Sequence, residues 1–490
     1  MIFKFFKNKF ISYIILVTFT MAFFMAPRPA YATAGDGLVV YGEGTVTTPR
    51  YRTYTPTAFG NESNAQTANA TIQWVAMKTK PGATERIMGT LSSAASNNLT
   101  IQRWNGSSWA SPVEWQFTSN MSAYRSFDII YENLSGKSLV VYAGDSSNPT
   151  RVYFRYWNGS TWSSPANFTF TTGIGDIQWI RLASKLNSNE IAVIAVGSDN
   201  QVNVNGRIWD PDTNTFPAST EPSGGLGLVQ SPTTESFDAV YETASGDLMV
   251  AWSASVTARW ANATRTGSTW TINNNPPELG THKINHLALA ASPLSTSNRL
   301  AVVALCNNSA LSVGRWDGSN WTNQNHLDDN STSATHAADA AFAGTTDNAI
   351  VVYSGVESNV NVDWVRSVAG GAFSIQTDYN PGGTPSNPEA IVNLTADASS
   401  SKLMLLRAHQ TNLYLRAHVY NEATQSWSTP TGDPLETNIS GGETYDSFAF
   451  AWESVFNIPT LGVALTVVVI SSFIAIMVKR RVILLKPSPA

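Results

Sequence analysis

Acidic side chains recur in this sequence at the start of short apolar runs, as in Phe-Asp-Ile-Ile-Tyr from residue 127 to residue 131. The aligned positions are Thr71, Asp128, Asp176, Asp238, Asn285, Asp339, Glu389 and Asp446. If the fold brings the carboxylates of this set into one ring, their oxygens suit a hard cation such as calcium. Alternatively, each carboxylate accepts hydrogen bonds from backbone groups of the turn that enters its own repeat.

Basic side chains recur at a second position, close to an aromatic residue. They are Arg52, Arg103, Arg155, Arg207, Arg259, Arg315 and Arg416. We expect each aliphatic stem to pack on a neighbouring aromatic ring while the guanidinium stays in water. The alternative is a clamp for an anion such as a glycan carboxylate, because guanidinium groups bind carboxylates through two parallel hydrogen bonds.

The other reactive residue types form no recognisable motif. Cys306 is the single cysteine and lies in an apolar run, which excludes an internal disulfide and predicts a buried thiol. The six histidines show no metal-ligand spacing, and no phosphate-binding loop, dinucleotide fingerprint or Gly-x-Ser-x-Gly motif occurs. Only 13% of residues are charged and the net charge is −5, which argues against a nucleic-acid partner. We therefore assign no catalytic residue.

Aromatic pairs define the repeat that must position these side chains. The clearest pairs are Trp104 with Trp109, Trp157 with Trp162, and Trp316 with Trp321. Asn-Gly or Asp-Gly inside each pair predicts a hairpin with a type I′ turn, across which the two aromatic rings pack. With looser copies included, the second aromatic falls at positions 59, 109, 162, 216, 270, 321, 373 and 427, so that copies are 50 to 54 residues apart.

Two further strand-like runs precede each hairpin, which gives four short strands per repeat. Four-stranded repeats of this length are typical of β-propeller blades, whose first strand lines the central channel. The first copy lacks its first strand, and the run after Tyr445 resembles a first strand with nothing behind it. We expect these two fragments to pair, closing an all-β ring of eight four-stranded blades without exposed sheet edges. Seven blades remain the alternative, if the N-terminal fragment packs outside the ring.

The two ends of the chain predict export and anchoring. Residues 1–32 have the basic, apolar and small-residue order of a signal peptide, with cleavage expected after Ala32. Residues 33–455 form the predicted propeller. Residues 458–478 carry no charge and are long enough to cross a bilayer, and Lys479, Arg480 and Arg481 follow at once. We expect a transmembrane helix or sorting tail over 456–481, a cytoplasmic tail over 482–490 and the N-terminus outside.

Two short segments resemble known families. The run from Phe456 to Gly462, with the apolar stretch and basic cluster behind it, resembles the sorting tails that exosortases and archaeosortases recognise (PEP-CTERM-like and IPTL-type signals), which implies such an enzyme as a processing partner. Unlike those tails, this chain continues to Ala490. Gly-Ser-Thr-Trp at 159–162 and 267–270 is similar to the second half of the sialidase Asp-box, but Trp157 and Arg265 stand where that motif has its Asp. Sialidase activity is therefore not expected.

The architecture from about residue 37 to residue 453 resembles multi-bladed surface propellers of bacteria and archaea, a fold that serves many functions. We interpret the protein as a surface-anchored, non-catalytic binding or adhesion module, with glycans as candidate ligands. One alternative is a carbohydrate-active hydrolase or lyase that uses two channel carboxylates roughly 5–10 Å apart. The other is a passive envelope protein without a soluble ligand.

Overall fold

The computed structural model describes residues 35–92, 98–116, 123–230, 232–254, 259–280, 282–331, 336–355, 362–381, 389–409, 413–440 and 445–454. The expected signal peptide, the expected membrane span and the basic cluster Lys479–Arg481 lie outside these residues. Within the described ranges, no helix is both long and apolar enough to span a bilayer.

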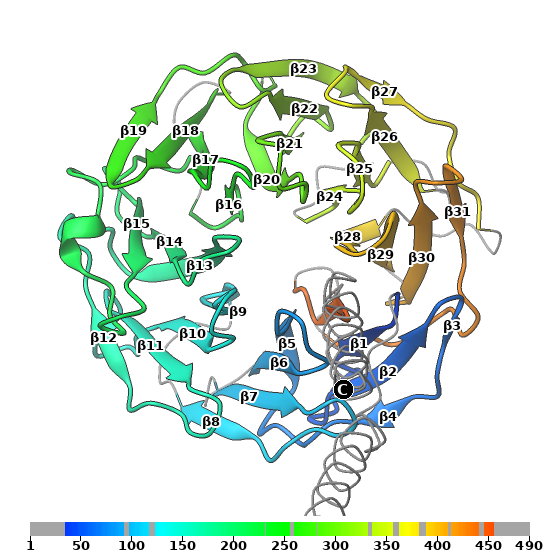
Figure 1. The fold of residues 1–490 in the computed structure, drawn as a ribbon, viewed down its shortest axis with the longest axis horizontal. Helices are drawn as coiled ribbons and strands as arrows, with labels where there is room; N and C mark the ends of the chain where they lie inside the picture. Colours follow the sequence, from blue (N-terminus) through cyan, green and yellow to red (C-terminus); the bar gives the residue numbers. More distant parts are fainter. Residues whose placement is uncertain are drawn as a thin grey trace, which may run out of the picture.

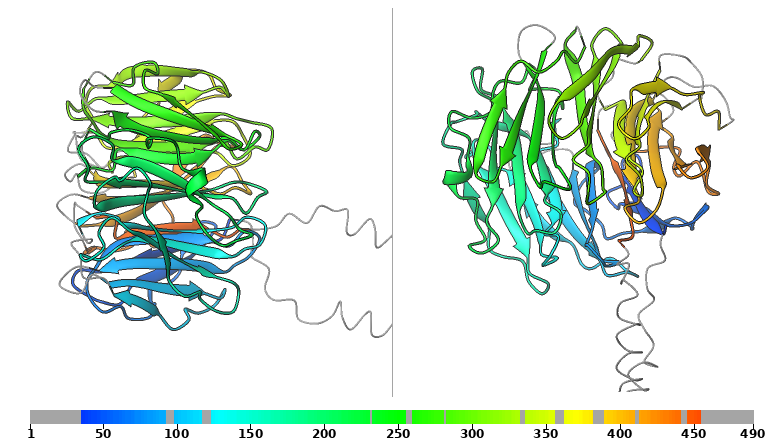
Figure 2. Two further views of the ribbon diagram at one scale, coloured as in Figure 1. Left: turned by 90° about the vertical axis from the view of Figure 1, so that its left-hand side faces the viewer. Right: turned by 45° about the horizontal axis from the view of Figure 1, so that its top comes forward.

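Eight antiparallel sheets surround a central axis, with the first strand of each sheet innermost (Figure 1). Seen from the side, the ring is a thick disc (Figure 2).

Blade 1 contains β32 (Phe448–Trp452), β1 (Gly37–Tyr41), β2 (Arg50–Thr55) and β3 (Ala58–Phe59), with β4 (Ser63–Asn64) also paired with β2. Blade 2 contains β5 (Ile72–Thr79), β6 (Arg86–Ser92), β7 (Asn98–Trp104) and β8 (Val113–Gln116). Blade 3 contains β9 (Phe127–Tyr131), β10 (Ser138–Ala143), β11 (Val152–Trp157) and β12 (Ala166–Phe168). Blade 4 contains β13 (Ile177–Ser184), β14 (Ile191–Gly197) and β15 (Val204–Trp209), followed by the short helix η2 (Ala218–Thr220).

The other four blades have four strands each. Blade 5 contains β16 (Phe237–Tyr241), β17 (Leu248–Ala254), β18 (Arg259–Thr266) and β19 (Thr269–Asn273). Blade 6 contains β20 (Ile284–Ala291), β21 (Leu300–Cys306), β22 (Leu311–Trp316) and β23 (Trp321–Asp328). Blade 7 contains β24 (Ala338–Phe342), β25 (Ala349–Tyr353), β26 (Asp363–Ser367) and β27 (Phe373–Ile375). Blade 8 contains β28 (Glu389–Ala396), β29 (Lys402–His409), β30 (Leu415–Asn421) and β31 (Ser426–Ser428).

The ring closes in the way that the two incomplete copies predict. Strand β32 from the C-terminal end pairs with β1 from the N-terminal end, with Val39 opposite Phe450. The prediction of eight blades is confirmed, and the seven-bladed alternative is wrong. Blade 4 departs from the four-strand expectation, because only two isolated bridges, Asp210 with Thr215 and Val204 with Gly227, stand in place of a fourth strand among the described residues. Pro217 lies just beyond the first of these bridges and has no N–H to give to a fourth strand.

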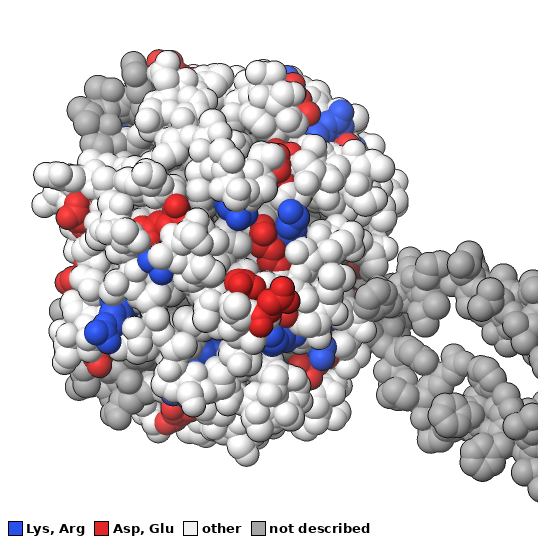
Figure 3. All heavy atoms as spheres, turned by 60° about the vertical axis from the view of Figure 1, so that its left-hand side comes forward, with Lys and Arg blue, Asp and Glu red and all other residues white. Residues whose placement is uncertain are grey.

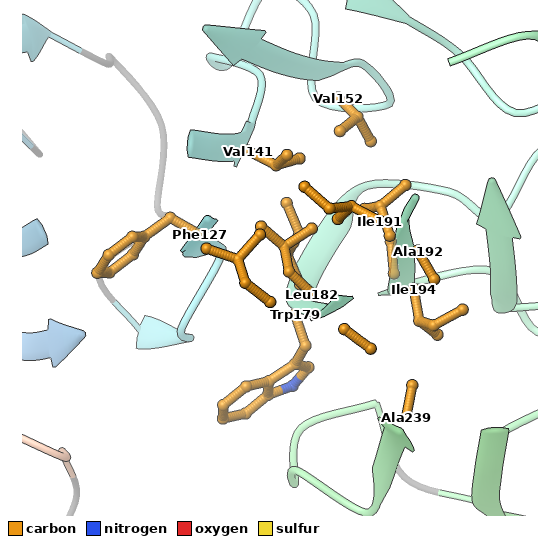
Figure 4. Packing of buried hydrophobic residues seen from close by; sticks show 14 of the residues in the cluster. Phe127, Val141, Val152, Trp179, Leu182, Ile191, Ala192, Ile194 and Ala239 are labelled. Carbon is orange, nitrogen blue, oxygen red and sulfur yellow. The ribbon is translucent and has the colours of Figure 1, made fainter. Parts of the chain in front are cut away.

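The second strands of the blades form a buried layer of the ring. All seven residues of β14 and all seven of β21 are buried, which matches their continuous apolar sequences. Between blades 3 and 4, Phe127, Val141 and Val152 lie close to Trp179 and Ile191 in one apolar layer (Figure 4). On the face shown in Figure 3, acidic and basic side chains are both present and scattered among uncharged residues.

The aromatic hairpins form, but with a turn of a different kind from the predicted one. The Trp104 and Trp109 ring centroids are 5.4 Å apart, and the other two clear pairs have centroids 5.6 and 5.5 Å apart. In the first hairpin, Gly106 has a positive φ of 103°, whereas Asn105 does not have a positive φ. The Asn105 Oδ1 atom instead accepts the N–H groups of Ser107 and Ser108 at 2.9 Å. The type I′ assignment was wrong, because the Asn side chain caps the loop from an ordinary backbone conformation.

Candidate functional site

The innermost strands alternate between two types, which gives the ring a two-blade period. The first strands of blades 2, 4, 6 and 8 have eight residues and a bulge after their first residue. The first strands of blades 1, 3, 5 and 7 have five residues and no register shift. The channel therefore has approximate four-fold rather than eight-fold repetition.

Four residues that precede the short first strands form a ring at one level of the channel, which we call the collar. They are Arg125, Glu235, His336 and Asp446. Each collar carbonyl oxygen accepts a hydrogen bond from the next long first strand, and the four donors are the N–H groups of Ile180, Leu287, Val392 and Val75. This shared bond fixes the four side chains at equivalent positions around the axis.

Aromatic rings from the long first strands fill the channel at the collar. The ring of Trp74 lies 5.7 Å from that of Trp179, edge to face, and both lie 6.0 Å from the ring of His336. The His286 ring is 5.1 Å from that of His336, and the ring of Tyr445 is 5.3 Å from that of Trp74. The bulge in each long strand turns its residue 74, 179 or 286 toward the axis.

Three of the sequence-predicted acids, Asp128, Asp238 and Asp339, connect neighbouring blades. Each accepts one hydrogen bond from the next residue of its own strand and a second from the following blade. The donors are the N–H groups of Ile129 and Leu182 for Asp128, of Ala239 and Leu289 for Asp238, and of Ala340 and Leu394 for Asp339, at 2.7 to 2.9 Å. These carboxylates thus act as links between blades, with both oxygens engaged.

The remaining predicted acids do not complete that set. In blade 1, the residue equivalent to Asp128 is Ala449, because Phe448 lies opposite Tyr41 as Phe127 lies opposite Tyr142. Asp446 therefore belongs to the collar, three residues earlier. Asp176 is exposed and precedes β13, and Glu389 is the first residue of β28, with a side chain outside the described part. The two uncharged members, Thr71 and Asn285, also stand at or near the start of their long strands.

A cavity of about 390 Å³ brings Asp128, Asp238, Asp339 and Asp446 to one surface. Three cations, Lys78, Arg125 and Arg181, line the same cavity. Arg125 pairs with Asp128 at 2.7 Å, and Arg181 pairs with Glu235. The cavity is therefore a mixed-charge chamber and not the purely acidic ring that sequence alignment suggested.

The three linking carboxylates differ in proton affinity because the cations lie on one side of the chamber. Burial alone would raise the pKa of Asp128, but Arg125, Arg181 and Lys78 outweigh that effect and lower it. Burial raises the pKa of Asp238 to about 6 and that of Asp339 to about 7, against the N–H bonds and Arg181. Burial also lowers the pKa of Lys78.

Three of the recurring arginines, Arg103, Arg155 and Arg207, stack on aromatic rings. The guanidinium carbon of Arg103 lies 3.8 Å from the ring centroid of Trp157 in the next blade. Arg155 lies 4.7 Å from the ring of Trp115, and Arg207 lies 4.6 Å from that of Phe168. The aromatic partners agree with the first interpretation of the arginines, but the guanidinium groups themselves stack, and that of Arg207 is buried and paired with Glu221 rather than left in water.

Arg315 is different, because the aromatic ring that would cover it is replaced. Ser367 lies opposite Ala349 at the start of β25, as Trp157 lies opposite Ser138 at the start of β10. The small side chain of Ser367 leaves a crevice of about 170 Å³ between blades 6 and 7 (the neighbouring blades β20–β23 and β24–β27 in Figure 1). The Arg315 Nη1 atom is buried there without a hydrogen-bond partner among the described residues.

Other groups give this crevice a polar floor and an aromatic wall. Arg299 pairs with Asp347 across it at 3.0 Å, and Trp316 and Thr322 line it. The Trp316 Nε1–H group donates to Glu242 at 2.6 Å, which fixes the indole plane. The sequence shows Arg315 and Trp316 but not the crevice, because the crevice depends on a residue 52 positions later in the neighbouring blade.

No protein-family model matches this chain, and no curated protein matches it in sequence. Among solved structures, the BP39L lectin from Burkholderia pseudomallei superposes with a TM-score of 0.50 and 12% identity, over 73% of this chain and 99% of the lectin. This likeness shows a shared β-propeller fold. Two other solved structures are less similar. The six-bladed Aleuria aurantia lectin has a TM-score of 0.37 and 13% identity, over 64% of this chain and 97% of the lectin. The polysaccharide lyase Uly1 has a TM-score of 0.45 and 8% identity, over 76% of this chain and 95% of the lyase.

Proposed function

We propose that this protein is a non-catalytic, glycan-binding β-propeller of the cell surface, and that the crevice between blades 6 and 7 binds a sugar unit with a carboxylate. The main support for this proposal is the buried Nη1 atom of Arg315, which has no hydrogen-bond partner in the described residues and lies at an open crevice. An unsatisfied buried donor is costly, whereas a carboxylate oxygen would satisfy it with a charge-assisted bond. The lectin fold of BP39L is compatible with this proposal but does not establish it.

The size and lining of the crevice favour one sugar unit. Its volume of about 170 Å³ is below the ~300–1,000 Å³ of pockets that hold drug-sized ligands. Trp316 offers an apolar surface for the C–H face of a sugar ring, and Asp347 and Thr322 offer acceptors and a hydroxyl for its hydroxyl groups. The Arg299–Asp347 pair keeps Asp347 compensated, Asp317 adds a second carboxylate to the lining, and Arg315 supplies a guanidinium N–H without a partner among the described residues.

The test is a glycan array probed with the full chain in detergent, followed by titration with the best acidic and neutral glycans. Arg315→Gln removes the charge, and Ser367→Trp fills the crevice with the residue that blade 3 carries at this position. Both changes are expected to weaken binding at least about tenfold, the effect of losing one charge-assisted bond.

The matched control is Arg103→Gln, which alters an equivalent arginine under the ring of Trp157. Its binding should equal that of the unaltered chain. Binding that survives both Arg315→Gln and Ser367→Trp would move the ligand to another surface. If the array retains no glycan, the glycan-binding hypothesis is rejected and the hypothesis of a passive envelope protein is favoured.

The proposed location at the cell surface is argued from the sequence of the two ends of the chain. The signal-like residues 1–32 and the uncharged stretch 458–478 before Lys479 favour export and anchoring with the propeller outside. An exosortase-like or archaeosortase-like enzyme remains the proposed processing partner. Mass measurement of the membrane-extracted protein tests both, because cleavage near Pro459 would remove the basic cluster.

A further inference from the structure

Three collar residues from three different blades converge on one point near the axis. One nitrogen or oxygen atom from each of Glu235, His336 and Asp446 lies within 4.8 Å of the other two. The His336 Nδ1 atom is 3.4 Å from Glu235 Oε2 and 3.5 Å from Asp446 Oδ2. The Glu235 and His336 side chains are 1% and 6% exposed, so water solvates this cluster poorly.

Ordinary hydrogen bonding does not account for this arrangement. Both distances from His336 exceed the 2.7–3.2 Å or so of N–H···O bonds, and one Nδ1–H group serves one acceptor well. Apart from the ion pair at Oε1, the carboxylate of Glu235 has no hydrogen-bond partner among the described residues, and neither does Asp446 Oδ1. Arg181 pairs with Glu235 Oε1 but leaves Oε2 facing His336. Glu235 Oε2 is therefore a buried carboxylate oxygen without a hydrogen-bond donor, which a metal ion would satisfy.

The two distances from His336 Nδ1 fit a tetrahedral metal ion. Bonds of ~2.1 Å at the tetrahedral angle place two ligand atoms about 3.4 Å apart, close to the distances around His336 Nδ1. One imidazole and two carboxylates suit Zn²⁺ and similar transition-metal ions, whereas Ca²⁺ takes ~6–8 oxygen ligands and no imidazole.

We propose that Glu235, His336 and Asp446 form a site for a divalent transition-metal ion, with Zn²⁺ as the chemically best match. The ion would connect blades 5, 7 and 1 at the axis, and the Arg181–Glu235 pair would orient one of its ligands. His336 and Asp446 also line the chamber of about 390 Å³, so the fourth coordination position opens toward it for water or a ligand oxygen. This site is separate from the proposed glycan crevice and does not depend on it.

The experiment uses the full chain in detergent, stripped with chelator and dialysed against Zn²⁺, Co²⁺ or Ca²⁺. Bound metal is counted by elemental analysis, and the visible absorption of Co²⁺ reports tetrahedral coordination. We expect one Zn²⁺ per chain, uptake of Co²⁺ by the stripped chain with a tetrahedral spectrum, and no competition from Ca²⁺. His336→Asn and Asp446→Asn should each lower the affinity at least about tenfold.

His326→Asn is the matched control, because His326 also has a positive φ (51°, against 65° for His336) and its Nδ1 atom also meets an aspartate, Asp329, at 2.6 Å. Near-UV circular dichroism establishes that each variant retains its packed aromatic core. The proposal is overturned if the folded, unaltered chain retains no Zn²⁺, if both collar variants bind as it does, or if His326→Asn alone abolishes binding. Equal retention of Ca²⁺ would overturn the choice of metal class.

Discussion

The Asp339 carboxylate offers a direct test of the chamber electrostatics. Its two oxygens accept the N–H groups of Ala340 and Leu394 at 2.8 and 2.7 Å, and burial raises its pKa from the usual 3.8 to about 7. The perturbation is Asp339→Asn, which is neutral at every pH and retains one of the two acceptors.

The sign of the effect follows from proton linkage. A carboxyl group with a raised pKa in the folded state holds its proton more tightly there than in the unfolded chain, so its contribution to stability is fully present below about pH 4 and is lost as pH rises through about 7. At ~1.36 kcal/mol per pH unit, the contribution lost between the usual pKa of 3.8 and about 7 is roughly 4 kcal/mol for this fully buried group.

Near about pH 4.5, Asp339→Asn should lower the free energy of unfolding by ~1–3 kcal/mol, because its amide nitrogen faces a backbone donor. Near about pH 8 this penalty should shrink by roughly 3 kcal/mol, or reverse, since the unaltered chain then carries a poorly solvated charge. Urea unfolding at both pH values, with the slope checked for constancy, measures the change.

Asp128→Asn is the control, because Asp128 accepts the same two kinds of N–H bond but has a lowered pKa beside Arg125. Its ionised form is stabilised by folding, so its penalty should not shrink between about pH 5 and about pH 8. A penalty for Asp339→Asn that stays constant or grows with pH would show that the N–H bonds outweigh burial, and the reasoning would be refuted.

Two further predictions concern the packing of the blades. Gly197→Ala should destabilise the protein by ~1–3 kcal/mol, because a Cβ atom there would lie 2.1 Å from the carbonyl oxygen of Ile174. As a control, Gly173→Ala should change the thermal midpoint of unfolding little, since a Cβ atom there meets nothing within 4 Å. Equal midpoints for the two variants would contradict this packing. Burial raises the pKa of the Cys306 thiol to about 11, so a maleimide reagent near pH 8 should label it only after unfolding in urea, and rapid labelling of the folded chain would contradict its burial.

Repetition made most of the fold predictable from sequence. The spacing of 50 to 54 residues between aromatic hairpins such as Trp104–Trp109 set the blade count, and the two incomplete ends indicated that β1 and β32 pair. Continuous apolar strands such as β21 marked the buried layer. The turn type was missed because the Asn105 side chain, rather than its backbone, accommodates the tight loop.

The candidate sites were less predictable, since each depends on residues from different blades. Alignment by single blades hid the two-blade period and placed Asp446 with Asp128, whereas the strand register gives Ala449 that position. Glu235 and His336 lie in no shared motif, and nothing in the sequence indicates that they meet Asp446.

By itself, the sequence determined the repeat, the all-β architecture and the closure of the ring. These properties are local or periodic, and a pattern of apolar and turn residues is sufficient to encode them. Only the tertiary structure decided which side chains meet. A serine at 367 opens the crevice over Arg315, and three blades bring one atom each of Glu235, His336 and Asp446 within 4.8 Å of one another. Such contacts depend on the size and charge of side chains far apart in the chain, which a repeat pattern does not specify.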